Sequence, residues 1–173
     1  LLAGNLNPDL PENRWVFLAR YRMWAVYQDH SVEFSLDCLE TFTFEYESGG
    51  RWLFHIPTSE GKYYPVELTL CFGRNRNHTR MVVSRPAKER NDGLVLEDLK
   101  QIHIIIRPDI EDRNFHDTVK AWQGPEKQWD KAAKKDKNGF TFQPDSRRQF
   151  AIQSSKRDYV PEPEWQYMVH RSM

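Results

Sequence analysis

The segment Pro108–Asp117 carries the residues best suited to chemistry. It reads Pro-Asp-Ile-Glu-Asp-Arg-Asn-Phe-His-Asp and is separated only by Arg107 from an apolar run at Ile102–Ile106. Loops that leave buried strands are common positions for binding and catalytic residues. Its carboxylates could bind a metal, but they lack the spacing and the turn glycine of a calcium loop. We therefore expect no metal and no other cofactor, and an ion pair between Arg113 and a carboxylate that holds the loop in shape.

His116 beside Asp117 suggests the acid–base part of a catalytic triad. Adjacent residues rarely face one another, however, and no nucleophile accompanies the pair in the sequence. Glycoside hydrolysis needs two carboxylates held about 5–10 Å apart, and none of the 25 acidic residues stands out as part of such a pair. The sequence therefore nominates no catalytic residue, and we expect the chain by itself not to act as an enzyme; whether a longer protein that contains it does so stays open at this point.

Two of the six tryptophans stand in polar surroundings. Trp122 and Trp129 could stack on sugar rings, because an exposed indole offers an apolar face; packing at the surface is the alternative. The other four lie in strand-like tracts and are expected in the core or against a partner: Trp15, Trp24, Trp52 and Trp165. The candidate sugar contacts are these two tryptophans, Trp122 and Trp129, together with His116 of the polar segment.

Alternation of apolar and polar residues with a period of two predicts the elements that position these side chains. Val32–Tyr46 and Tyr64–Phe72 alternate as half-buried strands do, with a break at Leu39 and Glu40 that fits a bulge or a turn. Other tracts, Arg14–Tyr27 and Ile102–Ile106, are apolar on both faces, as is typical of covered strands. Shorter strand candidates are 52–56, 80–84, 140–142, 150–153 and 165–170.

About nine strand candidates, with no sustained helical periodicity and no internal repeat, favour an all-β fold. We expect a large, supersandwich-like antiparallel β-sandwich with one or two long loops or short helices, formed as a single domain by residues 1–173. Two segments could form short helices, Asp109–Trp122 and Glu126–Lys137. The second is rich in lysine, so we interpret it as an exposed excursion between strands.

Composition argues against several classes of function. The 25 basic and 25 acidic residues give a net charge of zero, whereas a nucleic-acid-binding domain normally carries a basic excess. No stretch approaches the about 18 apolar residues of a membrane span, and the start lacks the layout of a signal peptide, so we expect a cytoplasmic protein. Cys38 and Cys71 have no zinc-binding spacing. We expect two unpaired buried thiols, with a cross-strand disulfide as the alternative.

A more specific pattern runs from Ile104 to Thr118. An apolar strand ends in Arg107-Pro108, and the run Arg113-Asn114-Phe115-His116 follows after a short gap. This order resembles the N-terminal domain of bacterial and archaeal glycogen-debranching enzymes of the amylo-α-1,6-glucosidase type. In that family the strand ends in Arg-Pro, Arg-Asp-(Phe or Tyr)-His follows, and an aromatic tract introduced by Trp closes the domain. The matching structural motif is Arg107, Pro108, Arg113, Phe115 and His116, with Asn114 where Asp is usual and residues 164–170 as the closing tract.

The resemblance implies a non-catalytic sandwich that forms an N-terminal or internal part of a longer glycosidase. In such enzymes a barrel of paired helices supplies the carboxylates that hydrolyse α-1,6-glucosidic bonds, and the sandwich supports the barrel and helps to wall the glucan cleft. The implied partners are that helical-barrel domain of the same chain and, through the parent enzyme, an α-glucan. Two alternatives stay open: a free-standing carbohydrate-binding module and a protein-interaction sandwich without sugar chemistry.

Overall fold

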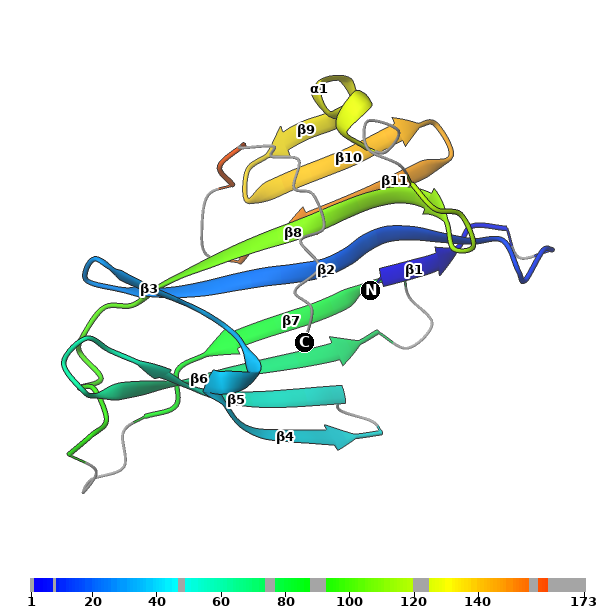
Figure 1. Cartoon of the computed structure of the whole chain (residues 1–173). Coiled ribbons are helices and arrows are strands. Elements are labelled where there is room, and N and C mark those ends of the chain that lie inside the picture. Colours follow the sequence, from blue (N-terminus) through cyan, green and yellow to red (C-terminus); the bar gives the residue numbers. More distant parts are fainter. Residues whose placement is uncertain are drawn as a thin grey trace. The chain divides into compact units, whose positions relative to one another are not determined.

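The computed structural model describes residues 2–7, 9–46, 49–73, 77–87, 93–119, 125–155 and 159–161. These residues are nearly all β (Figure 1). The strands are β1 Leu2–Asn5, β2 Arg14–Tyr27, β3 His30–Glu33, β4 Leu39–Glu45, β5 Gly49–Pro57, β6 Tyr63–Phe72, β7 Thr79–Ser84, β8 His103–Asn114, β9 Ala133–Asp136, β10 Gly139–Asp145 and β11 Arg148–Gln153. The helical turns are η1 Leu36–Cys38, η2 Pro125–Lys127 and α1 Trp129–Ala132. Within the described ranges, no helix is long and apolar enough to cross a membrane.

The chain divides into two compact units. Unit 1 comprises residues 1–20 and 108–173, and unit 2 comprises residues 21–107. The long strands β2 and β8, which pair with each other, contribute residues to both units. The expectation of a single domain over residues 1–173 stays a prediction.

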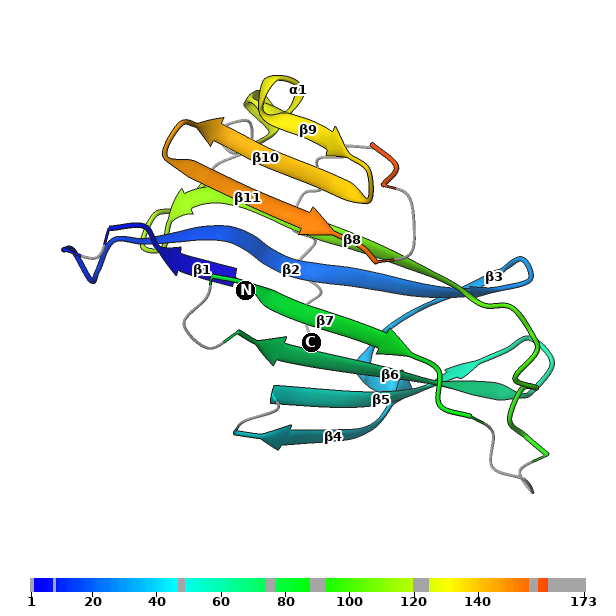
Figure 2. The same ribbon diagram turned by 180° about the vertical axis from the view of Figure 1, so that it is seen from behind.

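Unit 2 contains a four-stranded antiparallel sheet in the order β4-β5-β6-β7 (Figures 1 and 2). Its core cluster joins Phe54, Ile56, Tyr64 and Val66 of this sheet to Ala25 and Tyr27 of β2, with Val32 of β3 and Ile104 of β8 packed against the cluster. The core therefore lies between two sheets, because alternate residues of each sheet face the other one. This is the packing of a β-sandwich.

Unit 1 contains the antiparallel sheet β11-β10-β9 and the part of the β1-β2-β8 sheet that belongs to this unit. Phe140 and Phe142 of β10 form its buried cluster with Ala132, and Ile110 of β8 packs against them. Phe17 of β2 stacks on Phe150 of β11 with the ring centroids 6.0 Å apart. Side chains of two sheets again enclose the core, so the predicted all-β, antiparallel sandwich fold is confirmed.

Several elements differ from the sequence-based predictions. The tract Val32–Tyr46 is divided between β3 and β4 by the 3-10 turn η1, and the expected irregularity falls between Leu39 and Thr41 as a register shift. Asp109–Asn114 is not helical but continues β8. The lysine-rich segment is not only an exposed excursion, because it forms α1 and β9 and buries Ala132. Residues 165–170 lie outside the described residues. The free thiols of Cys38 and Cys71 are half-buried rather than buried.

Candidate functional site

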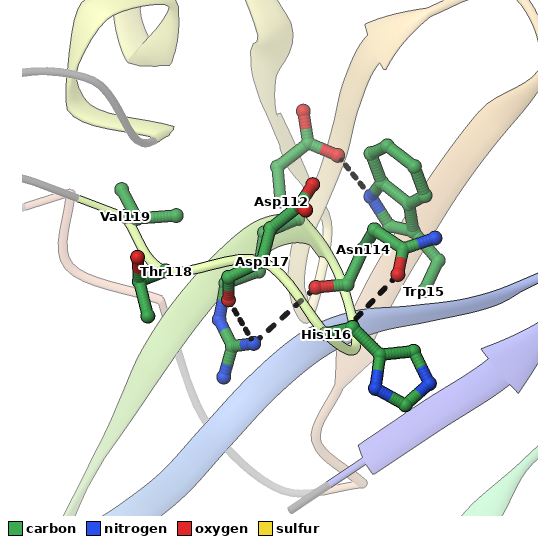
Figure 3. Close-up of a pocket in the computed structure, with 8 residues that line it drawn as sticks. Trp15, Asp112, Asn114, His116, Asp117, Thr118 and Val119 are labelled. Carbon is green, nitrogen blue, oxygen red and sulfur yellow. Dashed lines mark hydrogen bonds between the residues drawn. The ribbon is translucent and has the colours of Figure 1, made fainter.

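A polar hollow of about 450 Å³ lies in unit 1, where β8 ends. It is lined by Trp15 of β2, by Asp112–Asn114 of β8 and by His116–Val119 of the turn that follows (Figure 3). Phe115, at the start of this turn, donates its backbone N–H to the carbonyl of Arg14 over 2.8 Å, which ties the turn to the start of β2. The segment that is densest in polar residues thus forms a concave surface.

Asp112 occupies one wall of the hollow and is engaged from several directions. The indole Nε1 of Trp15 donates to its Oδ1 over 2.6 Å. The guanidinium of Arg148 binds both of its oxygens, with Nε 2.9 Å from Oδ1 and Nη2 3.2 Å from Oδ2, and lies 4.4 Å above the ring centroid of Trp15. Bidentate pairing and stacking on an aromatic face are the contacts that suit arginine best. The carboxylate of Asp112 therefore holds β8 to β2 and β11.

Arg148 is itself positioned by the turn between β10 and β11. Its Nη1 forms an ion pair with Asp145, which also accepts backbone N–H groups from Arg147 over 2.7 Å and Arg148 over 3.1 Å. The backbone hydrogen bond from Arg147 is the main reason that the pKa of Asp145 lies below its ordinary value, with the charges of both arginines acting in the same direction. The turn between β10 and β11 thus positions the guanidinium of Arg148 for its ion pair with Asp112.

Arg113 shapes the turn beneath the hollow. Its Nη1 donates to the carbonyl oxygens of Asn114, Phe115 and Asp117 at 3.3, 3.1 and 2.9 Å. Its Nε lies 3.4 Å from a carboxylate oxygen of Glu111. A guanidinium can bind several acceptors at once because its donors form a rigid fork, so Arg113 fixes the backbone of the turn and pairs with a carboxylate, as we expect from the sequence.

Asn114 closes the turn from the other side. Its side-chain Oδ1 accepts the backbone N–H of His116 over 3.1 Å, and its backbone carbonyl accepts the N–H of Asp117 over 3.1 Å. This is the local side-chain-to-backbone pattern that Asn and Asp share. The contact needs an oxygen acceptor and no negative charge, which explains physically why Asn can stand here in place of Asp.

The remaining side chains of the turn are open to solvent. His116, Asp117 and Thr118 are exposed and line the hollow, and the imidazole of His116 packs edge-on against the ring of Phe115 with the centroids 5.4 Å apart. Together they offer an imidazole and a hydroxyl, which can donate and accept hydrogen bonds, and a carboxylate, which accepts them. In the described part of the chain, no cluster of three or more His, Cys, Asp or Glu residues could hold a metal ion. The exposed groups can exchange hydrogen bonds with a ligand that is rich in hydroxyl groups.

Comparison with known protein families shows to which family the chain belongs. The family model described as "Glycogen debranching enzyme N terminal" matches residues 1–173. The chain belongs to the glycogen debranching enzyme N-terminal family. Comparisons with curated proteins and with solved structures gave no match. The resemblance inferred from the run between Ile104 and Thr118 is therefore confirmed, and the chain is a domain of a type found within larger debranching enzymes.

The structure places the predicted site residues of this debranching-enzyme domain in different surroundings. His116 lines the hollow, whereas Trp129 begins α1 and stacks on Phe142 with the ring centroids 5.5 Å apart. One face of that indole is therefore used in the core of unit 1. Trp122 lies outside the described residues. Arg107 and Pro108 lie in β8, and the glucan contacts of all three candidates stay predictions.

Two residues of the hollow's framework were missed by reasoning from the sequence. Trp15 is predicted only as a core or partner-facing residue, and Arg148 is not singled out at all. Both meet Asp112 from positions that are 97 and 36 residues away in the chain. The spacing of residues along the sequence does not predict such a contact, because the contact depends on which strands become neighbours in the fold.

Unit 2 has a smaller hollow of about 220 Å³ beside β7. Apolar side chains of Val66, Val83, Ile102 and Ile104 line it together with Arg85 and Lys100. Arg85 is occupied by backbone carbonyls of the neighbouring loop, including those of Leu96 at 2.7 Å and Lys100 at 2.8 Å. The polar hollow of unit 1 is therefore the better candidate for a binding site.

Proposed function

We propose that this domain is a non-catalytic part of a cytoplasmic glycogen-debranching glycosidase. It supports a helical-barrel catalytic domain of the same polypeptide, which hydrolyses α-1,6-glucosidic bonds, and it contributes the polar hollow of unit 1 to the wall of the glucan cleft. The family match supports the place of the domain in a debranching enzyme. The support for the cleft contact is the chemistry of the turn after β8.

The observation that carries the proposal is that some polar groups around the hollow are bound within the domain while others are exposed to solvent. The charged groups of Asp112, Arg113 and Arg148 are engaged in contacts within the domain, while the polar groups of His116, Asp117 and Thr118 are exposed. A preorganised turn that presents hydrogen-bonding groups binds a sugar hydroxyl without the cost of ordering a flexible loop. The engaged carboxylate of Asp112 also explains why the hollow suits binding better than bond cleavage.

Kinetics of the full debranching enzyme test the cleft contact. The substitution His116→Ala removes one hydrogen bond to the glucan, which contributes about 0.5–1.5 kcal/mol. We therefore expect KM for a branched limit dextrin to rise about threefold to tenfold with kcat unchanged. His30→Ala is the matched control, because His30 is also exposed but lies on β3 in unit 2. An unchanged KM in His116→Ala would remove the hollow from the glucan cleft.

Activity of the isolated chain tests the non-catalytic role. We expect residues 1–173 alone to release no glucose from a limit dextrin, because the exposed groups of the hollow include only one carboxylate, that of Asp117, and glycoside hydrolysis uses two. Glucose release that co-purifies with the chain and disappears in Asp117→Asn would contradict the proposal.

A further inference from the structure

One face of the sheet β4-β5-β6-β7 is apolar along its whole length. Strand register aligns Phe42, Trp52, Leu68 and Val83 in one row across the four strands. The next row contains Phe44, Gly50, Leu70 and Met81, and Phe72 follows beside Thr79. Because side chains alternate between faces, these rows lie on the same face as Phe54 and Val66, which belong to the core of unit 2.

Burial is confined to one end of this face. Phe54 and Val66 are only 8% and 2% exposed, whereas Phe42 is 52%, Phe44 63% and Phe72 64% exposed. We call the open end, formed by Phe42, Phe44, Leu70, Phe72 and Met81, the distal face. It continues the core-facing surface of the sheet beyond the point where the second layer of unit 2 covers it.

The distal face is an ordered surface. The rings of Phe42 and Trp52 are in contact, with centroids 4.9 Å apart. The indole of Trp52 in turn lies over Gly50, where an added Cβ would come within 2.5 Å of its Cη2 atom. Glycine at this position leaves room for the indole against the sheet, so Phe42 and Trp52 form a packed apolar floor at the inner edge of the distal face.

The opposite face of the same strands has the composition of a solvated surface. Thr41 and Thr43 alternate with the phenylalanines on β4, and Arg51 forms an ion pair with Glu67 across β5 and β6. The sheet thus has one face that is mainly polar and one that is apolar. Large exposed apolar surfaces of this kind are characteristic of interaction sites.

We propose that the distal face docks the catalytic portion of the debranching enzyme's own polypeptide. This inference rests on the proposed function and names the surface through which the domain supports its partner. A sheet face normally needs a second layer, and aromatic residues and methionine are enriched where proteins meet. The family match places this domain in a larger enzyme, and a covalently linked partner is present at a high effective concentration.

The chemistry of the distal face favours a protein partner over a glucan. Its five side chains include neither a carboxylate nor an amide, and a sugar site combines ring stacking with placed hydrogen-bonding groups. An apolar protein surface, by contrast, gains about 25 cal/mol for each Å² of apolar area removed from water. The distal face and the polar hollow thus have different ligands.

Photocrosslinking in the full enzyme identifies what covers the distal face. Phe44→p-benzoylphenylalanine keeps an aromatic side chain on the apolar floor, and Thr43→p-benzoylphenylalanine is the matched control one residue away on the opposite face. We expect position 44, but not position 43, to crosslink to peptides of the catalytic portion. Crosslinks to residues 1–20 or 108–173, crosslinks between two copies, or no crosslink from position 44 would each overturn the proposal.

Thermal unfolding supplies a second measurement. In Phe44→Glu a buried charge would face an apolar partner, so we expect this domain to unfold separately from and below the catalytic portion; Thr43→Glu should retain the coupled transition. Coupled unfolding in both variants would overturn the proposal. The KM test of His116 is independent: crosslinks with an unchanged KM would remove the cleft contact alone, and a raised KM without crosslinks would remove the docking surface alone.

Discussion

Two arginines, one in each unit, hold loops by binding backbone carbonyl groups, but the two loops expose different chemistry. Arg113 binds three carbonyls of the turn after β8 in unit 1. Arg85 binds the carbonyls of Leu96, Glu97, Asp98 and Lys100 in unit 2, at 2.7, 2.9, 3.5 and 2.8 Å. Both loops therefore owe their shape to one planar fork of donors.

The surroundings of the two guanidinium groups differ. Arg113 also pairs with Glu111 and lies beneath a turn whose His116, Asp117 and Thr118 are exposed. The loop of Arg85 instead buries Leu96 in the core and is paired with Tyr63 through backbone hydrogen bonds of 2.9 and 2.7 Å. The same device thus braces the core in unit 2 and presents polar side chains to solvent in unit 1.

Removing the two guanidinium groups should give the largest effects and separate the two roles. Arg85→Met takes the guanidinium donor away from the part-buried carbonyl of Leu96, a residue that is itself buried in the core. A buried group left unsatisfied costs about 1–3 kcal/mol, so we expect the free energy of unfolding to fall by about 2–3 kcal/mol with KM for limit dextrin unchanged. Arg113→Met leaves the carbonyl groups of the turn after β8 to bind water instead of the guanidinium, so it should cost about 1 kcal/mol of stability. It should also raise KM for limit dextrin, because the turn that presents His116 loses its shape. Urea unfolding and steady-state kinetics measure both quantities.

Equal losses of stability in the two variants would erase this distinction. A raised KM in Arg85→Met at a temperature where the protein stays folded would also contradict it, because Arg85 would then act on the glucan cleft rather than on the core.

Substitutions of Asn114 should have intermediate effects. Asn114→Ala removes the acceptor for the N–H of His116 and should cost about 1 kcal/mol of stability. Asn114→Asp retains the acceptor oxygen, so we expect stability within about 0.5 kcal/mol of the original protein. Urea unfolding of the three proteins at neutral pH is the measurement. If Asp proves as harmful as Ala, the side-chain acceptor is not what closes the turn.

Local patterns in the sequence predict much of the sheet structure. The apolar tract Arg14–Tyr27 is β2 from its first residue to its last, and Tyr64–Phe72 forms β6 with one more residue. Alternation succeeds here because one face of each strand packs on a core. The helical spacing read from Asp109–Trp122 misleads over Asp109–Asn114, because these residues continue β8 and Ile110 packs against the cluster of β10.

The candidate site is predictable in part. The polar density of Pro108–Asp117 and the order Arg113-Asn114-Phe115-His116 identify the turn, because these residues are contiguous. The framework behind the turn is not predictable, since Trp15 and Arg148 reach Asp112 only after distant strands have paired. The distal face also escapes prediction: alternation shows that Phe42 and Phe44 share a face, but not where the covering layer ends.

The effect that we predict to be smallest at neutral pH concerns Tyr64, which lies below the guanidinium of Arg85 with its ring centroid 5.9 Å away. Burial raises the pKa of this phenol from 10.0 to about 12, while the charge of Arg85 acts in the opposite direction. Between pH 10 and 12 the phenol of Tyr64 keeps its proton in the folded protein and releases it in the unfolded chain. The free energy of unfolding therefore keeps its full value below pH 10 and falls as the pH rises toward 12. Tyr64→Phe has no such proton and should show a shallower decline between pH 9 and 11 in urea unfolding. In folded Arg85→Met the opposing charge is gone, and the absorbance of the phenolate should appear at still higher pH. A lower titration midpoint, at pH values where circular dichroism shows the variant to be folded, would show that Arg85 does not act on Tyr64.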